Sequence, residues 1–401
     1  MSDTPNTWKK DEMSFGLIII LLILICIPNG ANSQEIDSET DSFEQFKDFF
    51  TIYPNKKAAA ADSTLYKAKL VIAPVISYSP ETSLGIGAGA KYLFKFRGSG
   101  EETRTSNMPV TLQYTLKNQF FAYSGFEIIT NQEDWVIEGN LLVQNFPRLF
   151  YGLGRESQKT NEEEYDYFQV LVEPIFLKRM FTRYLFVGAG IRYNSISNVV
   201  AEEDGLLENI APEGFLGSTS MGAEFAVLYD SRDNILNANR GWYFEFTHGF
   251  YGRVLGGTQE FQLTRVDTRY FFRPFKKRTD IIGLHLTGSS SSGDVPFSEL
   301  ALFGGDEILR GYIEGRYVDR NLLAGQVEYR ANLIGRLGIV AFFGGGDVLN
   351  NLGDFRIGNL RASFGAGLRF LLDRTERLNI RADWGFGEGT NNLYLQIGES
   401  F

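Results

Sequence analysis

The chain has 401 residues, and 39 lysines and arginines against 49 aspartates and glutamates give it a formal net charge of −10. A net-acidic chain without a basic block is not typical of a nucleic-acid-binding protein. The counts of 43 Gly, 34 Phe and 19 Tyr are high and favour strands that pack around glycine and are flanked by aromatic rings. A hydrophobic content of 43% fits either a soluble protein or a membrane protein with alternating polar residues, and composition does not separate the two.

The first 33 residues have the pattern of a signal peptide. Lys9 and Lys10 precede the apolar run Phe15–Ile27, which is shorter than the roughly 20 residues that a membrane-spanning helix needs. Small residues at 31–33 then form a cleavage site. We therefore predict export, with residues 1–33 as the removed signal peptide. The start codon stays open between Met1 and Met13.

The only cysteine, Cys26, lies inside this apolar run, so we expect no disulfide and no Cys-based metal site in the working chain. A lipid anchor on Cys26 is the less favoured alternative, because Ile25 stands where lipoprotein signals carry a small residue. Residues 34–68 follow as a polar segment that is too short for a sizeable domain. We predict a short periplasmic or plug segment there, with one amphipathic helix over Ser42–Phe50.

From residue 69 to residue 401 the sequence repeats segments of alternating apolar and polar residues, separated by polar, Gly, Pro or Asn breaks. We expect sixteen strands, which begin near residues 69, 83, 108, 119, 135, 165, 183, 217, 241, 259, 279, 321, 337, 361, 377 and 392. Short connections alternate with long ones, as at the two ends of a membrane barrel, although the connection 97–107 is long for the short end. The predicted fold is all-β: a 16-stranded antiparallel transmembrane β-barrel over residues 69–401, preceded by a short N-terminal periplasmic segment. A soluble β-sandwich is the alternative.

The most specific motif lies in the connection 293–320, where Phe303–Tyr312 reads FGGDEILRGY. It resembles the loop 6 signature of the BamA/TamA-type outer-membrane assembly superfamily, the bacterial surface antigen family. Three further segments are similar to this family in the same order: the first hairpin around Tyr78–Gly87, the turn from Leu228 to Gly241, and the aromatic-to-Asp strand Phe342–Asp347. The resemblance covers about residues 69 to 401.

The resemblance implies that loop 6 folds back into the barrel, where an arginine needs charged partners because a desolvated ion is costly. It assigns Arg310, Gly311 and Tyr312 to the loop, and Glu328 and Asp347 to the carboxylates that Arg310 contacts. The guanidinium can form two charge-assisted hydrogen bonds, and Gly311 lets the backbone approach closely. The alternative is that Arg310 is a solvent-exposed cation of the loop without a structural role.

The chain end carries a second signal. Leu393, Leu395, Ile397 and the terminal Phe401 are similar to the C-terminal β-signal by which outer-membrane barrels are recognised. The last strand is expected to close against the first strand at a seam. In this superfamily the seam can open and pair with an incoming strand. An aromatic residue at the membrane interface is the simpler interpretation of Phe401.

Signatures of catalysis are weak in this sequence, and we predict a protein that is not an enzyme and has no cofactor and no metal. The two histidines are His248 and His285, and no serine stands beside His248 to form the outward nucleophile site of an outer-membrane phospholipase. The glycine run 85–89 lacks the Gly-Lys-Ser/Thr of a nucleotide-binding loop.

The expected location is the outer membrane of a Gram-negative bacterium, with outer-membrane lipids around the barrel. The family's better-known members carry periplasmic POTRA domains, and residues 34–68 are too few for one of them, so we expect a barrel-only member. The favoured function is to assist the insertion or translocation of proteins, with nascent outer-membrane or secreted proteins and a periplasmic partner as its partners. The alternatives are an accessory or structural barrel that binds a partner protein, and a small-solute channel.

Overall fold

The computed structural model describes residues 50–62, 65–79 and 83–401. The predicted signal peptide, Cys26, the two candidate start residues and nearly all of the predicted helix at 42–50 lie outside these residues. The described strands are β1 (Thr51–Ile52), β2 (Lys69–Ser79), β3 (Ser83–Phe94), β4 (Ser106–Thr115), β5 (Phe120–Ile129), β6 (Trp135–Asn145), β7 (Arg148–Phe150), β8 (Glu163–Arg179), β9 (Leu185–Val200), β10 (Ser218–Asp230), β11 (Gly241–Tyr251), β12 (Phe261–Phe272), β13 (Ile281–Gly293), β14 (Ala301–Phe303), β15 (Tyr317–Asp319), β16 (Asn321–Ile334), β17 (Leu337–Leu349), β18 (Arg361–Asp373), β19 (Leu378–Gly387) and β20 (Thr390–Ile397). The helices are α3 (Lys56–Ala61) and α4 (Leu206–Ile210), and the 3-10 turns are η1 (Asn131–Glu133), η2 (Lys159–Asn161), η3 (Arg253–Leu255), η4 (Phe297–Glu299), η5 (Leu352–Asp354) and η6 (Ile357–Asn359).

The long strands pair antiparallel with their neighbours along the chain, from β2 through β6, β8 and β13 to β16 and β20. Their first residues lie within two residues of the predicted starts, so the predicted antiparallel β structure is confirmed. The predicted number of strands is not: the main sheet of the described residues has 18 strands, because the very short β1 and β7 also join it. A separate hairpin, β14–β15, lies in loop 6 (residues 294–320). In the part of the chain that the structure describes, no helix is long and apolar enough to span a membrane.

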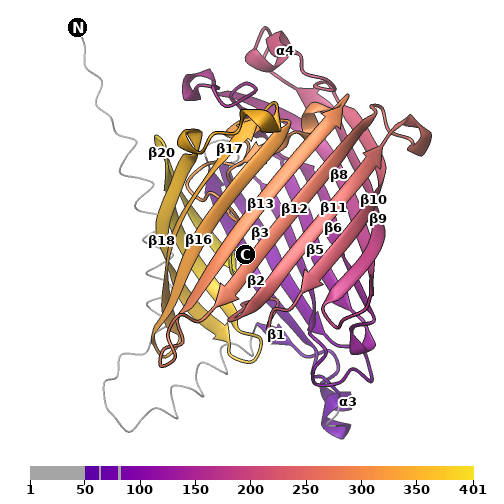
Figure 1. The fold of residues 1–401 in the computed structure, drawn as a ribbon, viewed down its shortest axis with the longest axis vertical. Helices are drawn as coiled ribbons and strands as arrows, with labels where there is room; N and C mark the ends of the chain where they lie inside the picture. The colour runs from indigo at the N-terminus through magenta and orange to yellow at the C-terminus, as the bar shows by residue number, and fades with distance from the viewer. Residues whose placement is uncertain (1–49, 63–64, 80–82) are drawn as a thin grey trace. The chain divides into compact units, whose positions relative to one another are not determined.

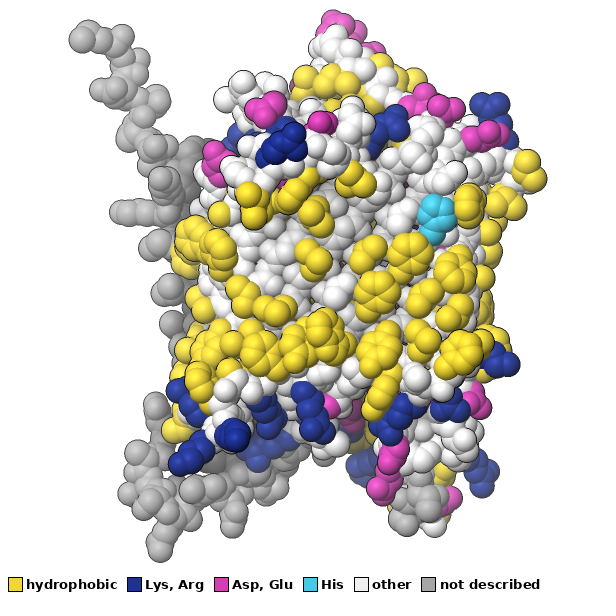
Figure 2. All heavy atoms as spheres, in the orientation of Figure 1, with side chains coloured by type: hydrophobic (Ala, Val, Ile, Leu, Met, Phe, Trp, Pro, Cys, Tyr) yellow, Lys and Arg dark blue, Asp and Glu magenta, His cyan; other side chains and the backbone are white. Residues whose placement is uncertain are grey.

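Alternation along the strands gives the sheet one apolar face and one polar face. Leu284, Leu286 and Phe343 are exposed on the outer face, whereas Glu224 and Glu328 are almost fully buried on the inner one. Figure 2 shows hydrophobic side chains spread over the outer surface of the strands, with lysines and arginines gathered below them. Such a pattern suits a sheet that curls around a polar interior and meets lipid outside.

Contacts between distant strands show that the sheet of residues 69–401 does curl. Arg104, just before β4, forms an ion pair with Asp230 at the end of β10. Arg377, between β18 and β19, lies 2.8 Å from Asp233, between β10 and β11. In Figure 1, β11 to β13 accordingly lie in front of β2 to β6. The connection 95–105 is as long as the sequence indicated, and Arg104 near its end also forms an ion pair with Glu133 at 3.1 Å.

Two strands end the ladder. β2 pairs with β3 and β20 pairs with β19, and no residue register joins β20 to β2 in the described residues. The predicted closure of the barrel at this seam is therefore not seen. In the described residues, β20 has no strand on its second side, and on its second side β2 pairs only with the two-residue β1, so most of the backbone groups along these two edges have no strand partner.

Candidate functional site

Loop 6 enters the interior of the curled sheet and packs there. Ile308, Leu309 and Tyr312 at its tip are buried in an apolar cluster with Phe303 of β14 and Val348 of β17. This cluster holds the tip of the loop in place, because it removes the apolar side chains of the tip from water. Between these apolar residues stands Arg310, whose side chain is 0% exposed.

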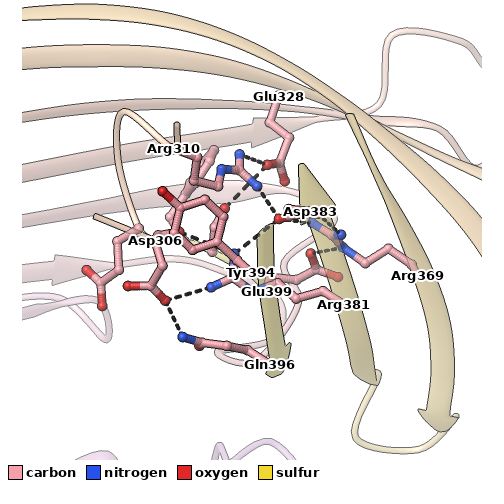
Figure 3. Close-up of polar contacts among 12 residues, drawn as sticks. Asp306, Arg310, Glu328, Arg369, Arg381, Asp383, Tyr394, Gln396 and Glu399 are labelled. Atoms are coloured by element: carbon pink, nitrogen blue, oxygen red, sulfur yellow. Dashed lines mark hydrogen bonds and ion pairs between the residues drawn. The ribbon is translucent and has the colours of Figure 1, made fainter. Parts of the chain in front are cut away.

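Arg310 contacts carboxylates on two strands (Figure 3). Its Nη1 donates to Asp383 Oδ2 of β19 at 2.5 Å, and its Nη2 donates to Glu328 Oε2 of β16. The Cζ atom lies 3.6 Å from the centroid of the Phe342 ring of β17. A buried guanidinium with two carboxylates and an aromatic face has its desolvation offset by paired charges and a cation–π contact. We call these four residues the tip anchor.

Further arginines surround the tip anchor and balance its negative charge. Asp383 also accepts hydrogen bonds from Arg369 of β18 and Arg381 of β19, and Glu328 accepts one from Arg330. Figure 3 shows Arg310 and Arg369 converging on Asp383. Removal of a single arginine therefore leaves these carboxylates with fewer partners but not with none.

Two glycines allow the loop backbone to touch β19. Gly311 has φ +112°, and a Cβ placed there would lie 2.5 Å from the carbonyl carbon of Phe386. A Cβ on Gly385 would lie 2.5 Å from the carbonyl carbon of Arg310. Only glycine fits both positions without a shift. Gly385 therefore makes room for loop 6 against β19.

The tip also binds the terminal strand. Tyr394 of β20 accepts a hydrogen bond from the Gly311 N–H at 2.9 Å and donates to the Tyr312 carbonyl at 3.2 Å. Asn392 of β20 donates to the Gly311 carbonyl at 3.0 Å. The Tyr312 hydroxyl donates to the Ala362 carbonyl of β18 at 2.9 Å. Loop 6 is thus tied to β20, which pairs only with β19 among the strands that the structure describes.

The structure brings Arg310, Gly311, Tyr312 and Glu328 together, as the resemblance implied, but not Asp347. Asp347 lies at the far end of β17, 3.2 Å from Arg155 and 3.8 Å from Arg361. The register explains this difference: Glu328 is opposite Phe342, whereas Asp347 is opposite Leu323. That offset of five residues corresponds to about 17 Å along a strand. Asp383 takes the place that the sequence interpretation gave to Asp347.

The chain end departs from the prediction in part. Leu393, Leu395 and Ile397 are exposed on the outer face of β20, as the alternation indicated. β20 ends at Ile397, and Gly398 has φ +121°, so the last residues turn inward. Phe401 is buried against the His285 ring, with centroids 4.8 Å apart, and not on the lipid-facing side of the strand.

This inward tail joins the tip anchor. The Ser400 hydroxyl donates to Glu328 at 3.3 Å, and Arg330 donates to the Phe401 carbonyl oxygen at 2.9 Å. Arg369 donates to Glu399 at 2.7 Å. The end of the chain and the tip of loop 6 therefore share Glu328. No sequence signal short of the register could have revealed this sharing.

Sequence analysis missed a second attachment of loop 6, near its first residues. Glu299 of η4 accepts hydrogen bonds from Arg192 at 2.6 and 2.7 Å and from Asn194 at 2.8 Å, both on β9. Arg192 also donates to Glu173 of β8 at 2.7 Å. We call Glu299, Arg192, Asn194 and Glu173 the stem anchor. The sequence offered one signal for this site: Arg192 and Asn194 are polar residues at alternate positions on the inner face of β9.

Comparison with known proteins decides the family. The model of the Omp85 superfamily domain matches residues 87–401. The chain belongs to the Omp85 superfamily. Proteins of this superfamily are outer-membrane β-barrels. No curated protein sequence matches the chain.

Two solved structures share the fold of this Omp85 chain at low identity. BamA from Haemophilus ducreyi lacking POTRA domains 1–3 has a TM-score of 0.50 and 12% identity, with 82% of this chain and 69% of that chain covered. CdiB from Acinetobacter baumannii has a TM-score of 0.55 and 12% identity, with 84% of this chain covered. The match spans only 60% of the CdiB chain.

In the Omp85 chain, the start of β2 is linked to the end of β18 and to the turn between β18 and β19. Lys69 of β2 forms ion pairs with Asp373 at 3.0 Å and Glu376 at 3.2 Å, in and after β18. The Tyr66 hydroxyl donates to Glu376 at 2.5 Å. Burial and the nearby Glu376 carboxylate raise the pKa of Tyr66 above its usual range, so the hydroxyl stays a donor. These contacts join the two sides of the seam without a backbone ladder.

The histidines take roles in packing. His285 is buried on the inner face, and its Nε2 lies 3.2 Å from Asp267. His248 Nδ1 lies 2.8 Å from the Thr264 hydroxyl, and its ring packs against Phe250. Within the described residues, no group of three His, Cys, Asp or Glu side chains is placed to hold a metal ion.

Proposed function

We propose that this Omp85 chain assists the insertion or translocation of proteins at the outer membrane of a Gram-negative bacterium. The observation that carries the proposal is the pair of strand edges, β2 and β20, which lack a common ladder in the described residues. An unpaired edge offers backbone donors and acceptors to an incoming strand, and such pairing is a recurrent way to bind an extended segment.

Loop 6 supports the proposal because it contacts the edge strand directly. The hydrogen bonds of Tyr394 and Asn392 fix β20 to the backbone of Gly311 and Tyr312. We infer that Arg310, through Glu328 and Asp383, sets the position of β20 and so the width of the seam. Leu393, Leu395 and Ile397 keep the outer face of this strand apolar for lipid. Catalysis has no part in the proposal.

The partners that we propose are nascent outer-membrane or secreted proteins and a periplasmic partner, with outer-membrane lipids around the strands. The accessory barrel remains the second candidate, because the ion pairs of Lys69 join the two sides of the seam. A small-solute channel is disfavoured, since loop 6 and the tail at 398–401 fill part of the interior.

Photocrosslinking in living cells tests the proposal. A probe at Ile72 on β2 or at Leu395 on β20 faces outward at an edge, because both side chains are exposed. The control position is Leu286 on β13, which is also exposed but lies in a strand paired on both sides. We expect short-lived adducts with several newly made proteins from both edge positions and none from Leu286.

The other outcomes assign a different function. One persistent adduct from the edge positions would favour the accessory barrel, and adducts of equal yield from Leu286 would contradict a function of the edges. A steady conductance of the purified chain in planar bilayers, without any adduct, would favour the channel.

A further inference from the structure

The turn between β12 and β13 is strongly basic. Arg273, Lys276, Lys277 and Arg278 lie within six residues, are all exposed, and are followed by a single acidic residue, Asp280. We call residues 273–278 the basic turn. Such a density of positive charge at one place on a net-acidic chain calls for a negatively charged partner or for nearby carboxylates.

Nearby carboxylates do not supply that charge. Asp280 is buried and forms an ion pair with Arg278 at 2.8 Å, and it also accepts a hydrogen bond from Tyr329. Lys276 and Lys277 have no ion pair or hydrogen bond to any residue of the described chain. Two of the four cations are therefore free to bind a group outside the protein.

Aromatic side chains stand directly between the basic turn and the apolar outer surface. Trp242 of β11 stacks on Tyr270 of β12 with ring centroids 4.2 Å apart, and Tyr270 stacks on Phe272 at 5.4 Å. Phe275 is exposed within the turn itself. Rings of this kind lie at the level of lipid headgroups, where their apolar faces meet acyl chains and their polar atoms meet water.

Positive charge is denser at this end of the strands than at the other. Arg240 and Arg374 lie in neighbouring turns of the same end, whereas Asp233 and Glu376 there are occupied by Arg377 and Lys69. At the other end, the connection 201–217 has five acidic residues and no basic one. Figure 2 shows this difference: lysines and arginines gather below the apolar surface, and acidic side chains are prominent above it.

We propose that the basic turn and the aromatic row Trp242, Tyr270 and Phe272 form a binding surface for the headgroup of an anionic phospholipid. The ammonium groups of Lys276 and Lys277 bind the phosphate by charge-assisted hydrogen bonds. The aromatic row fixes the depth of the chain in the bilayer. The proposal requires that the chain spans a membrane, but it does not depend on protein insertion.

Electron paramagnetic resonance of spin-labelled lipids tests this surface. The purified chain is reconstituted in phosphatidylcholine vesicles with a trace of labelled phosphatidylglycerol or labelled phosphatidylcholine. The motionally restricted fraction then gives the relative affinity of the two lipids for the protein surface. We expect phosphatidylglycerol to be favoured by about fivefold in low salt, and the preference to fall as salt screens the charges.

The variant Arg273→Gln/Lys276→Gln/Lys277→Gln should bring this preference close to one. Its matched control is Lys159→Gln/Arg253→Gln/Arg356→Gln, which removes the same charge from exposed connections at the other end. An unchanged preference in the first variant, or an equal loss in the control, would overturn the proposal.

Two further outcomes separate this surface from the proposed function. A chain that restricts neither lipid is not embedded in the bilayer, which overturns both proposals. A first variant that keeps its lipid preference but loses a co-purifying acidic protein assigns the basic turn to that protein and not to lipid.

Discussion

Loop 6 is attached to the sheet at two places, and the attachments differ in what lies behind them. The stem anchor binds Glu299 to β8 and β9, which are paired with neighbours on both sides. The tip anchor and its hydrogen bonds bind Arg310 and Gly311 to β19 and β20, at the end of the ladder. Both anchors pair buried arginines with carboxylates, so their local chemistry is alike.

The same kind of ion pair can therefore stabilise loop 6 at the stem anchor and fix the position of the seam at the tip anchor. A strand within a continuous ladder moves little when one side-chain contact is lost, because two sets of backbone hydrogen bonds still fix it. β20 has one such set in the described residues. We therefore expect loss of the tip anchor to change the seam, and loss of the stem anchor to change only the stability and order of loop 6.

The largest effect is expected from Arg310→Ala. Glu328 and Asp383 then lose their shared partner in a buried site, and we expect the free energy of unfolding to fall by about 3 kcal/mol. Loop 6 should become sensitive to protease, and the yield of crosslinks from Leu395 should change at least severalfold. Denaturation of the purified chain in detergent and protease digestion measure the first two effects.

Two variants control for this change. Arg310→Lys keeps the charge but cannot form both hydrogen bonds, so it should recover only part of the stability. Arg356→Ala removes an arginine from an exposed connection and should have no effect. If Arg310→Ala behaves like Arg356→Ala, Arg310 does not fix loop 6.

Glu299→Gln sharpens the comparison. The variant keeps the shape of the side chain but removes the charge that Arg192 and Asn194 bind, and we expect a loss of about 2 kcal/mol in the free energy of unfolding. Crosslinking from Leu395 should stay at its wild-type level, since β20 is not attached to Glu299. A change in that crosslink as large as the one in Arg310→Ala would contradict the separation of the two anchors.

Gly385→Ala tests the tip without a change of charge. The added methyl group would lie 2.5 Å from the Arg310 carbonyl carbon and must push the loop from β19, at a cost of about 1.5 kcal/mol. We expect the protease sensitivity of loop 6 to rise and the Leu395 crosslink to change in the direction seen with Arg310→Ala. Gly353→Ala is the matched control, because an added Cβ there meets nothing within 4 Å and should leave both readouts unchanged.

The sequence predicted the positions of the long strands and part of the tip anchor. Alternation predicted the first residue of each long strand to within two residues, because a strand between lipid and a polar interior must alternate apolar and polar side chains. The motif around Arg310 identified the buried arginine. The motif did not identify Asp383, since Asp347 is the nearer carboxylate along the chain.

Register supplies what the motif lacks. Glu328, Phe342, Gly365 and Gly385 lie opposite one another across four successive strands, and Asp383 is two residues from that row on the same face. The inward turn of Phe401 and the pairing of Glu299 with β9 depend on contacts across the interior, which alternation along one strand cannot encode.

The smallest expected effect lies outside both anchors, where Asp233 in the turn 231–240 contacts Arg377 at 2.8 Å. Burial raises the pKa of Asp233, but the hydrogen bonds from Arg377 and from the backbone of Asn239 and Arg240 outweigh it and hold the pKa below its usual value of 3.8. The contribution of Asp233 to stability is therefore present above pH 3.8 and is lost as the pH falls through its lower folded-state pKa. Asp233→Asn should lower the free energy of unfolding at pH 7 by about 0.5 kcal/mol, as for a pair near the surface. Acid denaturation of both chains in detergent checks this: the difference between them should vanish at low pH, and a difference that persists there would mean that packing, and not charge, fixes this turn.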